Sequence, residues 1–201
     1  MANLVIPEPS LVVLIGPSGS GKSTYAKKHF RLTEIVSSDH CRALISDDEN
    51  DQSVTPEAFE VLHLIVSRRL RKSRLTVVDA TNVQASSRRT LLELAREYGV
   101  PAVAMVFDFA ESTCLANNGK RLQRLVPAQV IATQLQDLRT SLPQLRNEGF
   151  AEIYILRNSN EVDQTAIIRR RYSGYRPPGS RPTERGPLEW LGKLLGNFRS
   201  R

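Results

Sequence analysis

The sequence predicts an α/β fold in which helices cover both faces of a parallel sheet of four to five strands. Short apolar runs are typical of buried strands, and they lie at 11–15, 75–78, 103–107 and 153–156, with a weaker fifth at 35–36. Helical patterns lie between these runs. Strands that are apolar along their whole length and alternate with helices indicate a parallel sheet buried on both faces.

The helices are expected from their start and stop signals. Four are predicted: from Lys22 onwards, from near Thr55, over 86–98 and over 127–143. The second has proline at its first helical position, which favours helix initiation. The third stops before a glycine, which favours the left-handed conformation that ends many helices.

Charge divides the chain into two parts. Residues 1–162 are expected to form one domain, and residues 163–201 a basic tail rich in Pro, Gly and Arg, flexible except for a helical pattern at 188–198. The net charge is +7, but residues 165–201 hold nine basic and two acidic residues, while residues 1–164 hold 19 of each. Anion binding by the neutral body must therefore come from a local arrangement of groups.

Composition argues against several classes of protein. The two cysteines, Cys41 and Cys114, lie far apart, which argues against a disulfide framework and a zinc site. No run is long and apolar enough to span a bilayer, and the first ten residues do not resemble a signal peptide. A cytoplasmic location without stable membrane association is expected, while the oligomeric state is left open.

A phosphate-binding loop is the strongest signal in the chain. Residues 16–23, GPSGSGKS, fit GxxxxGK[ST] in full, follow a predicted strand and open a helix, as expected for a P-loop NTPase. Backbone N–H groups and the helix N-terminus favour phosphate there, with Lys22 on the β and γ phosphates and Ser23 on Mg²⁺. The expected nucleotide-binding residues are Gly16, Ser18, Gly19, Ser20, Gly21, Lys22, Ser23 and Thr24. A glycine-rich turn that binds nothing is the alternative. ATP is favoured because no NKxD-like guanine-reading motif occurs.

Two carboxylates follow predicted strands. Ligands of an open parallel sheet lie beyond the carboxyl ends of its strands, so Asp39, Asp79 and the phosphate loop are expected in one crevice. Asp39 is either a base that accepts a proton from an attacking hydroxyl or a helix cap, and Arg42 either grips a substrate phosphate or is an exposed partner. Asp79 is expected to hold Mg²⁺ together with Ser23, the alternative being a turn-forming residue.

A basic segment, Asn117 to Arg124, follows. Arg121 and Arg124 would share one face of a helix. They suit a helical lid that neutralises the transferring phosphoryl group. A solvated basic face is the alternative.

Five segments together resemble the N-terminal kinase domain of bacterial polynucleotide kinase-phosphatase, an RNA end-healing enzyme. They are SLVVLIGPSGSGKSTYAKKHF, IVSSDHCRALISDDENDQ, AFEVLHLIVSRRL, LTVVDATNV and the arginine segment before VPAQVI, within about residues 5–157. The resemblance implies an ATP-dependent kinase that phosphorylates the 5′-hydroxyl end of RNA or DNA. It implies that Asp39 is the general base, that Arg42 binds the phosphate 3′ of the terminal nucleoside, and that Arg121 and Arg124 belong to the lid.

This sequence departs from the family pattern in two respects. The family usually begins its lid with arginine and asparagine, whereas this chain has Asn117 and Asn118. Related enzymes continue into phosphatase and ligase domains, so such functions, if present, would lie on separate partner chains. A kinase for small molecules and an ATP-binding module with little turnover are the alternative hypotheses.

Overall fold

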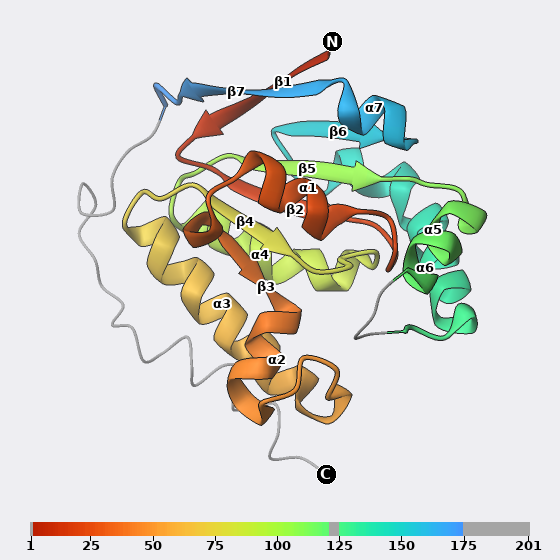
Figure 1. Cartoon of the computed structure of the whole chain (residues 1–201). Coiled ribbons are helices and arrows are strands. Elements are labelled where there is room, and N and C mark those ends of the chain that lie inside the picture. The colour runs from red at the N-terminus through yellow and green to blue at the C-terminus, as the bar shows by residue number, and fades with distance from the viewer. Residues whose placement is uncertain (1, 121–124, 175–201) are drawn as a thin grey trace.

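A five-stranded parallel sheet forms the centre of the computed structural model, which describes residues 2–120 and 125–174 (Figure 1). Its strand order is β3–β4–β2–β5–β6, and every neighbouring pair is parallel. The strands are β2 (Leu11–Ile15), β3 (Ile35–Ser37), β4 (Thr76–Asp79), β5 (Ala102–Phe107) and β6 (Glu152–Leu156). The predicted fold class and all five predicted strands are confirmed.

Helices connect the strands and pack on both faces of the sheet (Figure 1). The α-helices are α1 (Lys22–His29), α2 (Ser38–Ser46), α3 (Thr55–Arg71), α4 (Ala85–Glu97), α5 (Glu111–Gly119), α6 (Ala128–Ser141) and α7 (Ser159–Asp163). Short 3-10 helices occupy η1 (Leu32–Glu34), η2 (Gln52–Val54) and η3 (Leu142–Asn147). The four predicted helices are α1, α3, α4 and α6. Helices α2 and α7 were not predicted, and α5 reaches the start of the predicted lid segment.

The core has two parts because side chains of a strand alternate between the faces of the sheet. On one face, Val13 of β2 belongs to a cluster with Leu62 of α3 and Leu91 of α4. On the other face, Val12 belongs to a cluster with Tyr25 of α1, to which the N-terminal strand also contributes. This double burial explains why the central strands are apolar at every position.

The N-terminal end of the chain forms a second sheet with a segment that was predicted to be a tail. Strand β1 (Ala2–Glu8) pairs in parallel with β7 (Thr165–Arg171), so the prediction that residues 163–201 are a tail is wrong for 165–171. Tyr154 of β6 donates a hydrogen bond from its hydroxyl to the carbonyl of Val5 at 2.9 Å, which joins this ribbon to the main sheet. The ordered body therefore extends past residue 162.

Other predictions have separate outcomes. Arg121, Arg124 and the helical pattern at 188–198 lie outside the described residues. Cys41 and Cys114 are both buried and form no disulfide. Within residues 2–120 and 125–174, no helix has the length and apolar character needed to cross a membrane.

Candidate active site

The phosphate-binding loop joins the end of β2 to the start of α1, as predicted. Gly19 and Gly21 have φ angles of 81° and 89°, a left-handed conformation that favours glycine. A Cβ atom at Gly19 would lie 2.2 Å from the carbonyl oxygen of Cys114 in α5. Glycine is therefore needed at position 19 both for its backbone conformation and because α5 packs directly against the loop.

Lys22 lies at the first position of α1, and its side chain is almost fully buried. Its Nζ donates hydrogen bonds to the carbonyl of Pro17 at 2.8 Å and to Oγ of Ser20 at 3.4 Å. The ammonium group is thus held across the loop by the loop's own oxygens. A positive charge in this position, beside backbone N–H groups at a helix N-terminus, suits a polyphosphate.

Asp79 ends β4 and faces the same loop. It is almost fully buried, and burial raises the pKa of its carboxyl group, while the charge of Lys22 and a hydrogen bond from Ser23 act in the opposite direction. Magnesium binds one or two carboxylates and hydroxyls together with phosphate oxygens and water. The oxygens of Asp79 and Ser23 therefore fit the predicted magnesium site.

Asp39 lies in the first turn of α2, which follows β3, the strand next to β4. Strands β3 and β4 pair so that Ser37 is opposite Asp79, and the negative charge of Asp39 contributes to raising the pKa of Asp79. The helix cap is Ser37, whose Oγ accepts from the backbone N–H of His40 at 3.4 Å, so the alternative that Asp39 caps the helix is wrong. The structure thus brings Asp39, Asp79 and the loop together, as predicted.

Arg42 holds Asp39 in place. One turn along α2, its Nη2 donates to Oδ1 of Asp39, and its Nε donates to the carbonyl of Glu49 at 2.9 Å. The side chain is only 4% exposed, so the alternative of an exposed arginine is wrong. The acidic loop after α2 orients Arg42 through a backbone carbonyl, and the arginine in turn fixes the carboxylate.

The two asparagines in place of the expected lid arginine have defined contacts. Asn117 donates from Nδ2 to the carbonyl of Gly19 at 3.0 Å, so it ties α5 to the phosphate loop. Asn118 donates to the carbonyl of Val126 at 2.8 Å and accepts from its N–H at 3.1 Å, which closes the base of the segment between them. Since Arg121 and Arg124 lie outside the described residues, their predicted roles stay predictions.

A buried arginine that the sequence analysis missed supports the segment after Asp79. Arg88 of α4 is fully buried and donates from Nη1 to the carbonyls of Asn82 at 2.7 Å and Val83 at 3.0 Å. Its Nε donates to Oε2 of Glu148 at 2.7 Å. Asn82 donates from Nδ2 to the carbonyl of Leu14 at 2.8 Å, joining this segment to β2. These bonds fix the geometry between β4 and the phosphate loop.

Gln134 is the second contact that the sequence analysis missed. It lies on α6, and its Oε1 accepts a hydrogen bond from the backbone N–H of Ser18 at 2.7 Å. Helices α5 and α6 therefore both touch the phosphate loop. Neither contact has a local signal in the sequence, because an isolated polar residue on a helix most often faces solvent.

The parallel sheet and its phosphate-binding loop define a protein with a P-loop kinase-like fold. Comparison with known families gives the narrower assignment, since a family model described as "AAA domain" matches residues 11–145. The chain belongs to this AAA domain family.

Individual relatives are distant. The chain is 28% identical over 160 residues to "Transcription factor bHLH140" of Arabidopsis thaliana, which covers 76% of this chain and 16% of that protein. It is 41% identical over 49 residues to "Phosphate import ATP-binding protein PstB 3" of Streptococcus pneumoniae serotype 4, covering 24% of this chain and 20% of that protein. The chain thus spans only a small part of these curated relatives.

Solved structures share the fold. A chain in "Structure of the Pnkp1/Rnl/Hen1 RNA repair complex" has a TM-score of 0.60 and 23% identity, with 69% of this chain and 47% of that chain covered. A chain in the "AvrRxo1-ORF1:-ORF2" complex has a TM-score of 0.59 and 15% identity, with 75% and 55% covered. A related structure of the latter complex contains ATP.

Proposed function

We propose that this protein is a polynucleotide 5′-hydroxyl kinase that transfers the γ-phosphate of ATP to the 5′-OH end of RNA or DNA. The observation that carries the proposal is the position of Asp39, which arginine and strand pairing hold beside Asp79 and the phosphate loop. The fold similarity to a chain of an RNA repair complex supports it. A cytoplasmic location and separate phosphatase and ligase partners remain part of the proposal.

Each proposed role follows from the charge and position of a group. The Asp39 carboxylate accepts the proton of the attacking 5′-hydroxyl, whose oxygen then forms a bond to the γ-phosphorus while the bond to the leaving ADP oxygen breaks. Lys22 and the loop N–H groups bind the phosphates, and Arg121 and Arg124 add positive charge. Ser23 and Asp79 hold Mg²⁺, which supplies further neutralisation of the phosphate oxygens when bound.

The contacts of Arg42 support a positioning role that was not predicted more directly than they support the predicted grip on a substrate phosphate. In the structure as it stands, its contacts with Asp39 and the Glu49 carbonyl already keep the proposed catalytic carboxylate in place. A contact with a substrate phosphate requires the guanidinium to turn away from at least one of them. This observation favours the second candidate function, a kinase for small alcohols that needs no grip on a second phosphate.

Phosphate transfer from labelled ATP separates these functions. The acceptors are 5′-OH RNA, 5′-OH DNA and nucleosides, and the variants are Asp39→Asn and the exposed control Glu93→Gln. We expect transfer to polynucleotide ends, a loss of about 10²- to 10⁴-fold in Asp39→Asn, and wild-type ATP binding in both variants. Transfer to small alcohols alone would refute the polynucleotide kinase, and ATP binding without any transfer would indicate a binding module.

A further inference from the structure

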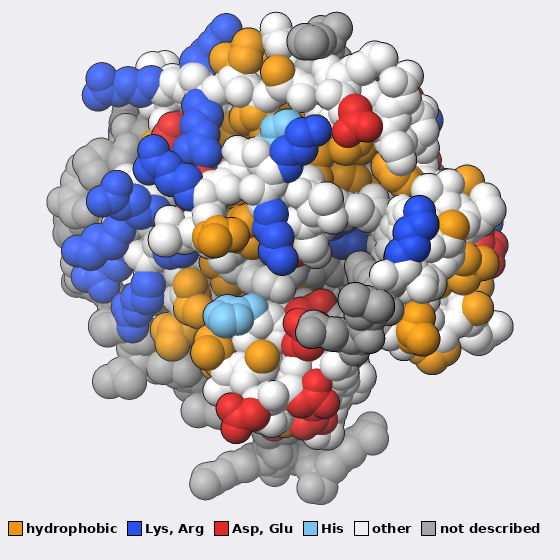
Figure 2. Space-filling model, viewed as in Figure 1, with side chains coloured by type: hydrophobic (Ala, Val, Ile, Leu, Met, Phe, Trp, Pro, Cys, Tyr) orange, Lys and Arg blue, Asp and Glu red, His pale blue; other side chains and the backbone are white. Residues whose placement is uncertain are grey.

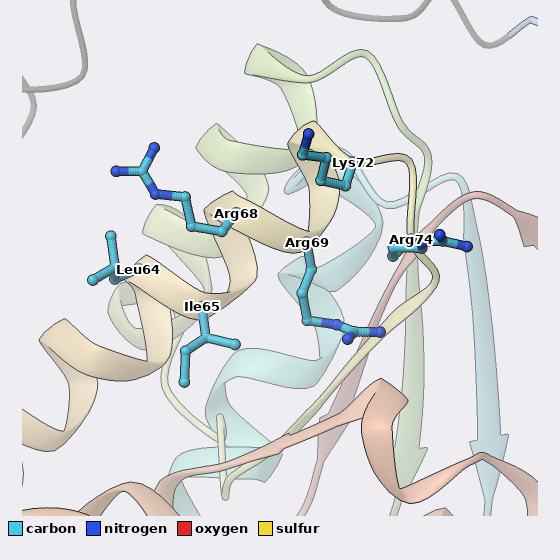
Figure 3. A pocket seen from close by; sticks show the side chains of 6 residues that line it. All are labelled: Leu64, Ile65, Arg68, Arg69, Lys72 and Arg74. Atoms are coloured by element: carbon cyan, nitrogen blue, oxygen red, sulfur yellow. The ribbon is translucent and has the colours of Figure 1, made fainter.

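A second site lies near the amino-terminal ends of the sheet strands, whereas the phosphate loop lies at their carboxyl ends. An open surface pocket of about 460 Å³ is lined by Leu64, Ile65, Arg68, Arg69, Lys72 and Arg74. Figure 3 shows the first four on successive turns of α3, Lys72 at the end of that helix and Arg74 on the segment that leads to β4. Because this segment precedes β4 whereas the phosphate loop follows the carboxyl end of β2, the two sites are separate.

The pocket carries uncompensated positive charge. Among the described residues no carboxylate forms an ion pair with Arg68, Lys72 or Arg74. Figure 2 shows Lys and Arg side chains gathered along the left side of this face, whereas the acidic side chains of the lower part lie around α2. Cations in the last turn of a helix interact favourably with its dipole, which accounts for Arg68. It does not account for Arg74, which lies beyond the helix.

Arg69 forms a rigid wall of the pocket. Its Nη2 donates to the carbonyl of Leu75 at 2.8 Å, and its Nε donates to Oγ1 of Thr76 at 3.3 Å. The negative charge of Glu34, which itself accepts two hydrogen bonds from Arg169, also acts on Arg69. The wall is therefore fixed to β4 and connected electrostatically to β7, while the other cations are available to a partner.

The floor of the pocket distinguishes between two classes of anionic partner. Leu64 is 37% exposed, and Ile65 is partly buried beside it. Among the described residues no aromatic side chain lines the pocket, so these residues offer no surface on which a nucleic acid base could stack. An apolar floor surrounded by cations instead matches a peptide that presents an apolar side chain between carboxylates.

We propose that this pocket docks an acidic segment of another protein. One apolar side chain of that segment packs on Leu64 and Ile65, and its carboxylates pair with Arg68, Lys72 and Arg74. Residues 175–201 of this chain do not fit as that segment, because they hold six basic and only two acidic residues. Their charge opposes binding to a basic pocket. The inference does not depend on the proposed kinase activity.

A peptide-display selection tests the proposal. Random 12-residue peptides are selected on the full chain, with counter-selection on Lys72→Glu/Arg74→Glu. The selected peptides are then measured by fluorescence anisotropy against wild type, this variant, Leu64→Ser and the control Arg139→Glu/Arg146→Glu, whose exposed cations lie on α6 and η3. Melting temperature and ATP binding show that each variant is folded. A 20-nucleotide single-stranded RNA serves as competitor.

We expect enriched peptides that combine Asp or Glu with Leu, Ile or Phe. The pocket charge variant should weaken their binding at least about tenfold, Leu64→Ser should weaken it roughly fivefold, and the control should leave it unchanged. The proposal is overturned if no peptide is enriched, or if the control weakens binding as much as the pocket variant. It is also overturned if Leu64→Ser has no effect, or if the RNA binds more tightly than the peptides and displaces them.

Discussion

Arg88 provides the sharpest test of how the body of the protein positions its site. We consider Arg88→Met, which keeps a long unbranched side chain and removes the guanidinium. The change leaves the carboxylate of Glu148 without its partner, and it removes the donor to the carbonyl of Asn82. The carbonyl of Val83 retains the hydroxyl of Ser141 at 2.5 Å, so it stays satisfied.

The expected loss of stability follows from these contacts. Breaking a buried ion pair by removing one partner costs about 3–5 kcal/mol. Since Glu148 is 14% exposed, water partly solvates its freed carboxylate, while the unpaired Asn82 carbonyl adds to the cost. We expect a decrease of about 4 kcal/mol in the free energy of unfolding, against a total of about 5–15 kcal/mol for typical proteins.

Urea unfolding at constant m-value measures this change. The matched control is Arg89→Met at the neighbouring exposed position of α4, for which we expect a change within about 0.5 kcal/mol. The double variant Arg88→Met/Glu148→Met should be more stable than Arg88→Met, because it removes both charges together. Magnesium-dependent ATP binding should also weaken in Arg88→Met, since Asn82 and Val83 follow Asp79, the proposed magnesium ligand.

Two results would refute this reasoning. A loss below about 1 kcal/mol in Arg88→Met would show that the buried network contributes no more than an ordinary hydrogen bond. A loss in the double variant that equals the sum of the losses in Arg88→Met and Glu148→Met would show that the two residues are not energetically coupled.

Two further predictions concern other parts of the fold. His63 has its pKa lowered to about 4 by burial, so the unfolded chain binds more protons below its usual pKa near 6.5. The contribution of His63 to the free energy of unfolding is therefore complete above pH 6.5 and decreases as the pH falls towards 4, by about 2 kcal/mol between pH 7 and 5. Unfolding curves of His63→Gln should lack this pH-dependent contribution. An identical pH dependence in the variant and the wild type would contradict the prediction. Gly19→Ala should weaken ATP binding at least about tenfold, because the φ angle of Gly19 disfavours a side chain and its Cβ would clash with the Cys114 carbonyl. The control Gly119→Ala, whose Cβ would meet nothing within 4 Å, should bind ATP as wild type does. Equal titration curves for the two glycine variants would disprove the close packing of α5.

Local patterns were sufficient for the central sheet and the phosphate loop. A strand buried on both faces is apolar throughout, and a loop that wraps phosphate needs glycines at fixed spacing, so both features are visible in a few consecutive residues. The position of Asp39 and Asp79 near that loop then followed from the topology of a parallel sheet.

Features that depend on distant residues were not predictable. Strand β7 ends in three arginines and has only Thr165 buried, so its sequence has the composition of a basic tail. Arg88 pairs with Glu148, which is 60 residues away, and no local pattern indicates a buried arginine. Asn117 was interpreted as the loss of an arginine, whereas its contact with the Gly19 carbonyl depends on how α5 packs.

The β1–β7 ribbon has a consequence for how the chain is made. Ala2 pairs with Thr165, so β1, which is synthesised before the other described strands, can pair with β7 only after nearly all of the described body has been synthesised. Contacts between such distant residues form slowly, because closing a long loop opposes them entropically. Leu4 and Ile6 are buried in the finished protein, and until then their strand lacks its partner β7. Among the described strands, β1 is therefore the one on which a chaperone has the longest time to act.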